Sequence, residues 1–198
     1  MTAAGCLAVV ALCAGLAACR ATERPYQEQI AERRAEIDAF MRSAESPVPA
    51  DRRGSFPPLA YYPIDERFRV PAALKVARGD DTMEMSTSTG TRRAMRRIGT
   101  LAFSLEGQPM TLTAFAEATD TTLARLFVPF GDPTNRDETY RAGRYLDLDR
   151  TATGLYELDF NRAYHPYCVF NTSYECPIPP RENHLRMPIR AGERLALP

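Results

Sequence analysis

Residues 100–115, TLAFSLEGQPMTLTAF, hold two alternating runs of apolar and small or polar residues on either side of a glycine. In the first run, Leu101 and Phe103 are separated by alanine and followed by serine. A period of two places every second side chain on one face, as in a β-strand with one buried side. A glycine between two such runs favours a tight turn. This stretch therefore predicts an antiparallel hairpin that turns at Gly107 and Gln108.

The same period recurs on both sides of this hairpin. Apolar residues alternate over 68–76, and RYLDLDRTATGLYELDF (144–160) predicts a second hairpin that turns near residues 151–154. LARLFVPF (123–130) is a more continuous apolar run, which is typical of a central strand covered on both faces. The sequence thus predicts a mainly β fold, either an antiparallel β-sandwich or a partly open barrel.

One helix is expected ahead of the strands. Tyr26, Ile30 and Ile37 recur at helical spacing with charged residues between them, which predicts an amphipathic N-terminal helix over residues 26–45. The Ser-Pro-Val-Pro that follows ends this helix, because proline cannot continue the hydrogen-bond ladder. We expect residues 26–198 to form a single β-rich domain, with the helix packed on the sheet.

Residues 1–18 are interpreted as a signal peptide. They contain no charged side chain, and their apolar run is shorter than the roughly 20 residues that a lasting transmembrane helix needs. The last residues of this stretch and the next one, Leu16-Ala17-Ala18-Cys19, resemble the lipobox of bacterial lipoproteins, whose cysteine carries the lipid. A plain cleaved signal, with Cys19 incidental, is the alternative.

Lipidation of Cys19 predicts where the protein lies. Residues 19–25 would be a lipidated tether, and acyl chains that each contribute about 0.8 kcal/mol per buried methylene would hold the protein on a membrane. Arg20, rather than an aspartate, follows the cysteine, which favours the outer membrane. The expected partner is therefore a membrane, and the expected location is the cell envelope, on the periplasmic face.

The charge balance argues against nucleic-acid binding. Lys and Arg together number 25, as do Asp and Glu, so there is no overall basic excess to attract phosphates. The arginines of TRRAMRRIG (91–99) could touch anionic lipid, but they equally protect an edge strand from aggregation. The acidic loop 132–138 lacks the ligand spacing and central glycine of a calcium loop, and we expect its side chains to cap their own backbone. No cofactor is expected.

Arg144 is the residue that the pattern singles out. It shares a strand face with Leu146 and Leu148, and a guanidinium cannot be buried on that face alone. We expect it to be mostly buried against a carboxylate, with Asp159 as first choice and Glu182 as second, and the pair to border the principal pocket. A guanidinium fork also suits a small anionic ligand.

Three functional hypotheses follow from these residues. The first is a ligand-binding or accessory domain whose candidate site comprises Tyr140, Arg144, Asp147, Asp159, Asn161, Glu182 and Asn183. The second is a hydrolase-type enzyme that uses paired carboxylates, Asp147 or Asp159 with Glu182, as acid and base. The third is a purely structural envelope lipoprotein. No catalytic residue is assigned.

The cysteines near the C-terminus allow several interpretations. His165, Cys168, Cys176 and His184 are residue types that bind zinc, but their spacing matches no common zinc motif. Cys168 and His165 could also form a nucleophile pair. Once the signal is removed and Cys19 carries lipid, two cysteines remain in a compartment outside the cytosol. We therefore favour a Cys168–Cys176 disulfide over a metal site.

Three stretches together resemble a known family. They are LFVPFGDPTNRDETYRAGRYLDL, YELDFNRAYHPYCVFN and YECPIPPRENHLRMPIRAGE, and they are similar to the bacterial and archaeal domain of unknown function 1684. The resemblance implies no activity, cofactor or ligand. It does imply a glycine where Arg136 stands, a small residue at Arg141 and asparagine at His165.

Overall fold

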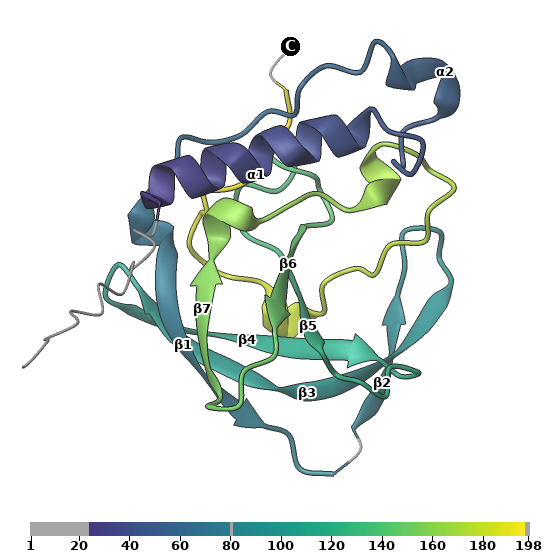
Figure 1. The fold of residues 1–198 in the computed structure, drawn as a ribbon. Coiled ribbons are helices and arrows are strands. Elements are labelled where there is room, and N and C mark those ends of the chain that lie inside the picture. The colour runs from purple at the N-terminus through teal and green to yellow at the C-terminus, as the bar shows by residue number, and fades with distance from the viewer. Residues whose placement is uncertain (1–23, 80, 197–198) are drawn as a thin grey trace, which may run out of the picture.

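The computed structural model describes residues 24–79 and 81–196 (Figure 1). The expected signal peptide and Cys19 lie outside these residues. No helix in the described ranges is both long and apolar enough to span a bilayer. The elements are helices α1 (Tyr26–Met41) and α2 (Ala50–Arg53), strands β1 (Arg69–Val76), β2 (Thr82–Ser86), β3 (Arg92–Leu105), β4 (Gln108–Glu117), β5 (Arg125–Phe130), β6 (Arg144–Asp149) and β7 (Leu155–Asp159), and the short 3-10 helices η1 (Glu66–Phe68), η2 (Phe160–Arg162), η3 (Tyr167–Val169) and η4 (Arg181–Asn183).

The strands form one antiparallel sheet in the order β6-β5-β4-β3-β1-β7, with β2 paired to the start of β3. The sheet curls so far that its two ends, β6 and β7, come into contact beneath α1 (Figure 1). The result is a nearly closed barrel. The expected mainly β fold with an N-terminal helix is confirmed, although α1 ends at Met41 rather than at residue 45.

The hairpin of residues 100–115 forms as β3 and β4. Leu105 pairs with Gln108, so the two turn residues are Glu106 and Gly107, one position earlier than expected. Their φ values of 48° and 76° are both positive, as in the type I′ turns that match the twist of paired strands. The glycine adopts this conformation at little cost.

The second expected hairpin is wrong. β6 pairs with β5, whereas β7 pairs with β1, so the two strands that share the turn at residues 151–154 are not partners in a ladder. The alternation correctly predicted both strands. They are not paired because β6 and β7, although consecutive in the chain, form the two opposite edges of the curled sheet. Asp159 therefore cannot meet a polar residue of β6 across a hairpin.

The barrel interior is apolar. Its fully buried side chains come from β3, β4, β5, β6 and β7 and from the C-terminal segment, and they include Leu101, Leu112, Leu126, Val128, Phe130, Leu158, Phe160 and Ile189. β5 contributes Leu126, Val128 and Phe130 to this core, and its alternate residue Phe127 packs on the outer face against Met85, Met95 and Phe115. Both faces of β5 are therefore covered, as expected.

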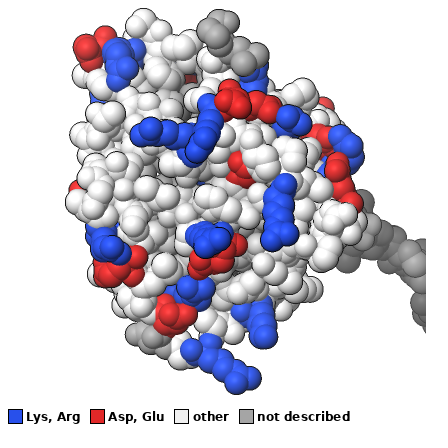
Figure 2. All heavy atoms as spheres, turned by 180° about the vertical axis from the view of Figure 1, so that it is seen from behind, with Lys and Arg blue, Asp and Glu red and all other residues white. Residues whose placement is uncertain are grey.

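Two of the four arginines of β3 have acidic partners. Arg93 pairs with Glu117 (3.2 Å), and Arg97 pairs with both Asp81 (3.0 Å) and Glu182 (3.2 Å). Figure 2 shows acidic and basic side chains interspersed over the face opposite to that of Figure 1. Exposed pairs of this kind contribute little to stability, and they leave no wide area of positive charge on that face to attract anionic lipid.

Candidate functional site

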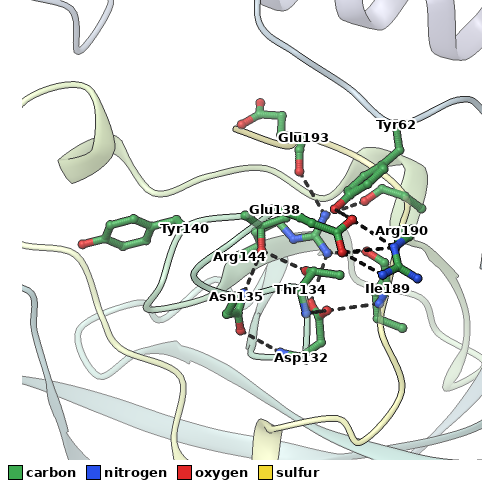
Figure 3. Close-up of polar contacts among 12 residues, drawn as sticks. Tyr62, Asp132, Thr134, Asn135, Glu138, Tyr140, Arg144, Ile189, Arg190 and Glu193 are labelled. Carbon is green, nitrogen blue, oxygen red and sulfur yellow. Dashed lines mark hydrogen bonds and ion pairs between the residues drawn. The ribbon is translucent and has the colours of Figure 1, made fainter. Parts of the chain in front are cut away.

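Arg144 lies at the start of β6 and is fully buried, with 0% of its surface exposed. One terminal nitrogen, Nη2, donates to the Asp132 carboxylate (3.1 Å) and to the carbonyl of Ile189 (2.6 Å). The other, Nη1, donates to the carbonyls of Ala191 (2.5 Å) and Glu193 (3.0 Å). Figure 3 shows these groups converging on the guanidinium. The prediction of a buried arginine that meets a carboxylate is confirmed.

The predicted partner of Arg144 is wrong, because the carboxylate is Asp132 rather than Asp159 or Glu182. Asp132 follows β5 directly, and its other oxygen accepts the backbone N–H groups of Thr134 (2.9 Å) and Ile189 (3.1 Å). The carboxylate thus caps its own loop and also holds the guanidinium. Burial lowers the pKa of Arg144, while the Asp132 charge opposes this shift.

Asp159 and Asn161 hold the helix to the barrel instead. The Asp159 carboxylate accepts the hydroxyl of Tyr26 (2.7 Å) and the backbone N–H of Asn161 (3.1 Å), and it pairs with Arg162 (3.0 Å). The Asn161 amide exchanges two hydrogen bonds with the backbone of Asp65 (3.0 and 2.9 Å). These contacts fix α1 and the segment before β1, so they explain both polar residues structurally.

Glu182 and Asn183 also have structural partners. Glu182 is exposed and pairs with Arg97, as described above. Asn183 is fully buried between β4 and β5, whose described ladder has a single residue pair. Its amide accepts the N–H of Thr113 (2.8 Å) and donates to the carbonyls of Thr113 (2.9 Å) and Pro129 (2.6 Å). The Asn183 side chain thus takes the place of backbone hydrogen bonds between β4 and β5 where these two strands are not paired.

Side chains of the loop 132–138 cap part of its own backbone, as expected, and others bind outside the loop. Asn135 accepts the N–H of Asp132 (2.7 Å) and donates to the Thr139 hydroxyl (2.9 Å). Glu138 binds Arg190 (2.7 Å) and the hydroxyl of Tyr62 (3.0 Å). Tyr140 points away from the Arg144 network in Figure 3, toward Cys168, with 3.8 Å between its hydroxyl and the sulfur.

The main cavity lies elsewhere, so the expectation that the Arg144 pair borders it is wrong. It has a volume of about 570 Å³ and lies between α1, the outer face of β5 and β6, and the segment after β7. Strand alternation explains this, because Arg144 and Leu146 point into the barrel while Tyr145 and Asp147 face outward. The wall includes Ile37, Phe40, Met95, Phe127, Tyr145, Asp147, Tyr164, His165, Tyr167, Cys176 and Glu193.

Aromatic rings make up much of the cavity wall. The rings of Phe127 and Tyr145 meet edge to face at 4.7 Å, and those of Tyr145 and Tyr164 do so at 5.7 Å. Tyr145 is anchored by a hydrogen bond from its hydroxyl to the carbonyl of Pro177 (2.5 Å). Edge-to-face pairs of this kind stabilise one another, so this wall is a preformed surface for apolar groups.

Asp147 is the one candidate ligand-binding residue that lines this cavity. Its carboxylate is exposed to the cavity and accepts the hydroxyl of Tyr164 (2.9 Å). The surrounding side chains reduce its hydration and so raise its pKa, whereas the Tyr164 hydrogen bond and the nearby Arg125 oppose this shift. The other carboxylates of the hydrolase hypothesis, Asp159 and Glu182, bind arginines outside the cavity, so the proposed acid–base pairs do not converge.

His165 and Glu193 form a buried pair in the cavity wall. The Glu193 carboxylate accepts the backbone N–H of His165 (2.7 Å) and lies 3.5 Å from Nδ1 of its ring. The other ring nitrogen, Nε2, accepts the N–H of Tyr140 (3.2 Å), which places the proton of the neutral ring on Nδ1. Burial lowers the pKa of His165 to about 3 and raises that of Glu193 to about 7. Sequence reasoning missed Glu193, because no motif surrounds it.

Among the described residues, His165 makes no hydrogen bond to Cys168, because its Nε2 accepts the N–H of Tyr140 and its Nδ1 faces Glu193. The structure therefore gives no support to the Cys168–His165 nucleophile pair. Cys168 and Cys176 are free, buried cysteines, and the Cys168 N–H donates to the Cys176 sulfur (3.1 Å). The hydrogen bond between the two thiols lowers the pKa of Cys168 to about 6 and raises that of Cys176. Within residues 24–79 and 81–196, no three His, Cys, Asp or Glu side chains are placed to share a metal ion, so the zinc interpretation has no cluster to support it.

The comparisons with known proteins agree with this architecture. Residues 54–194 match the family described as protein of unknown function DUF1684. The chain belongs to this family. A solution NMR structure of an uncharacterized protein from gene locus rrnAC0354 of Haloarcula marismortui is 34% identical, and the match covers 86% of this chain and 94% of that chain with a TM-score of 0.67. No curated protein matches.

The backbone conformation at residue 136 explains why the family pattern has glycine there. Arg136, where the resemblance implies glycine, has a φ of 99°, a region that side chains other than glycine rarely adopt. Its N–H still bonds to the carbonyl of Thr139 (3.0 Å). The loop therefore keeps a conformation suited to glycine, and its hydrogen bonds hold the arginine in it.

We predict that Arg144→Ala lowers the free energy of unfolding by about 3–5 kcal/mol, because Asp132 would remain buried without its partner. Urea unfolding measures this loss. Arg125→Ala is the control, since Arg125 is exposed and lies 3.7 Å from Asp149. The control should change stability by less than about 1 kcal/mol. Equal losses in the two variants would contradict the role assigned to Arg144.

We also predict a pH dependence from Glu193. Its raised pKa means that the folded protein keeps a proton that the unfolded chain releases, so this contribution to stability is present at pH 4 and is lost as the pH rises through about 7. Glu193→Gln removes this dependence while keeping an acceptor for the His165 N–H. From pH 5 to pH 8, the stability of the variant relative to the natural protein should increase by about 2–3 kcal/mol.

Urea unfolding at the two pH values measures this change. The exposed Glu182, changed to glutamine, is the matched control. A difference between Glu193→Gln and the natural protein that stays constant with pH would show that the buried carboxylate does not titrate in this range.

Proposed function

We propose that this protein is a lipid-anchored lipoprotein of the cell envelope whose barrel domain binds a small, largely apolar molecule in the cavity between α1 and the outer face of β5 and β6. The observation that carries the proposal is the cavity itself. Its volume of about 570 Å³ falls within the range of small-molecule sites, and its wall combines aromatic rings with a few polar groups. We do not propose the expected anionic ligand, because both terminal nitrogens of Arg144 already donate to groups of the protein.

The anchor rests on the sequence. Leu16-Ala17-Ala18-Cys19 ends an uncharged apolar stretch, and α1 begins at Tyr26 after a short tether. A lipid at Cys19 would hold the barrel close to a membrane surface, and Arg20 favours the outer membrane. A binding domain at this place would take its ligand from the envelope space.

We expect metabolic labelling with a fatty acid to mark the full-length protein and to fail in Cys19→Ser. Membrane fractionation of the same cells should move the variant from the membrane to the soluble fraction. Cys13→Ser is the matched control, because it lies within the expected signal peptide and should leave labelling unchanged. Labelling that persists in Cys19→Ser would contradict the lipid anchor.

We further propose that Cys168 and Cys176 are joined by a disulfide in the mature protein. Their contact supports this, as does the expected compartment, in which two protons and two electrons would pass to an oxidising disulfide. Closing this loop should add about 2.5 kcal/mol to stability. Alkylation in denaturant without reductant should leave both cysteines unmodified, and in Cys168→Ser it should modify Cys176. Two alkylated thiols in protein isolated from the envelope would contradict the bond.

A variant that fills the cavity tests whether ligands bind there. Ile37 lies on α1 and lines the cavity, whereas the exposed Ala39 of the same helix does not line it. Compounds that raise the melting temperature of the natural protein should have no effect on Ile37→Trp and the usual effect on Ala39→Trp. If both variants respond like the natural protein, binding occurs outside the cavity. A screen without any hit would favour the structural lipoprotein.

A further inference from the structure

The polar groups of the cavity wall differ in how far the protein itself satisfies them. Nε2 of His165 accepts the N–H of Tyr140, and the buried Glu193 carboxylate accepts the backbone N–H of His165 and lies 3.5 Å from its Nδ1. Asp147 has one hydrogen bond, from the hydroxyl of Tyr164. Within the described part of the chain, no arginine, lysine or histidine nitrogen forms an ion pair with its carboxylate. Glu175 in the same wall likewise has one hydrogen bond, from the hydroxyl of Thr89 (3.3 Å). Asp147 is the acceptor with remaining capacity that lies on β6 next to the rings of Tyr145 and Tyr164.

The charges around the cavity favour a cation. The ionisable side chains of the wall other than His165 and the tyrosines and cysteine are the acids Glu117, Asp120, Asp147, Glu175 and Glu193 and the arginines Arg33, Arg93 and Arg125. Two of the three arginines already have acidic partners, since Arg93 pairs with Glu117 and Arg125 lies near Asp149. His165 stays neutral at physiological pH, because burial lowers its pKa to about 3. Without the Arg93–Glu117 pair and the buried Glu193, whose pKa is raised to about 7, the acids Asp120, Asp147 and Glu175 remain in the wall against Arg33 and Arg125.

The rings beside Asp147 suit the same kind of ligand. Asp147 pairs with Phe127 in the β5–β6 ladder, and Tyr145 and Tyr164 continue the aromatic wall from there. An organic ammonium group is attracted to the faces of such rings, and its alkyl or aryl part gains from contact with them. The Asp147 carboxylate is exposed, so a cation can approach it directly.

We infer that the cavity takes a small organic amine, whose ammonium group binds the Asp147 carboxylate while its apolar part lies against Phe127, Tyr145 and Tyr164. This inference rests on the proposed binding function and specifies its ligand class. The hydroxyl of Tyr164 orients the carboxylate, and the edge-to-face rings provide the apolar contact.

Three probes of similar size test the charge preference: 2-phenylethylammonium, 2-phenylethanol and 3-phenylpropionate. Titration calorimetry or NMR titration should show the ammonium probe binding about tenfold more tightly than the other two, since the ion pair and the attraction of the ring faces act together. Asp147→Asn keeps an acceptor for Tyr164 and should reduce the affinity for the ammonium probe about tenfold, to that of the alcohol. Circular dichroism and the melting temperature check that the variant is folded.

Asp137→Asn is the control, because Asp137 is exposed and does not line the cavity. It should leave all three affinities unchanged. Tighter binding of the carboxylate or the alcohol, unchanged binding of the ammonium probe in Asp147→Asn, or no binding of any probe would overturn the inference. Ligands from the cavity-filling screen that lose their effect in Ile37→Trp but carry no amine would overturn the ligand class and leave the binding function intact.

Discussion

The buried charge of Arg144 determines how the end of the chain is placed. A guanidinium inside an apolar barrel must be surrounded by acceptors, and here one carboxylate and three backbone carbonyls supply them. The carbonyls belong to alternate residues of 189–193, a segment without regular secondary structure. Because the same side chain binds this segment and Asp132, it fixes the C-terminal segment against the loop after β5.

The cavity wall depends on this arrangement. Gly192, with a φ of 77°, passes so close to the carbonyls of Phe160 and Ala163 that a Cβ would lie within 2.7 and 2.5 Å of them. The next residue, Glu193, is thereby placed beneath His165, whose ring in turn accepts the N–H of Tyr140. The Arg144 contacts inside the barrel thus help to position the buried Glu193, the neutral His165 and the loop before β6, all of which lie outside the barrel interior.

The sequence predicted the strands better than their partners. Alternation identifies the buried face of β6 and β7 because it depends on neighbouring residues alone, and both strands formed where expected. Pairing depends on how far the whole sheet curls, which no local pattern contains. The choice of Asp159 as the partner of Arg144 failed for this reason. Asp132, twelve residues before Arg144, could have been favoured because it follows β5, the strand that pairs with β6 along its length.

The candidate site shows the same division. Asp147 could be placed on the face opposite to Leu146 from sequence, but α1 and the segment after β7 cover that face through long-range contacts, so the cavity was not predictable. Glu193 gave no signal, because its burial results from the Arg144 contacts and not from its neighbours in the chain. The nearness of the two cysteines was predictable, because only seven residues separate them in the sequence. The structure shows the contact between them.

The residues that stand out in the sequence are not the residues that can bind a ligand in this structure. Arg144, Asn183 and Asp159 are conspicuous in sequence because polar groups among apolar neighbours need partners, and the fold supplies partners for them. In the part of the chain that the structure describes, Arg144 Nε and Asp159 Oδ2 have no hydrogen-bond partner, but both atoms are buried and neither residue lines the cavity, so a ligand in the cavity does not reach them. A ligand for the other atoms of these side chains would first break bonds that cost about as much as the new ones return. Asp147 is inconspicuous, because a charge on the outer face of a strand is ordinary, yet its carboxylate faces a preformed cavity with one hydrogen bond made. A side chain can bind a ligand when it is accessible and some of its hydrogen-bonding atoms have no partner in the protein. Asp147, on the outer face of β6, meets both conditions.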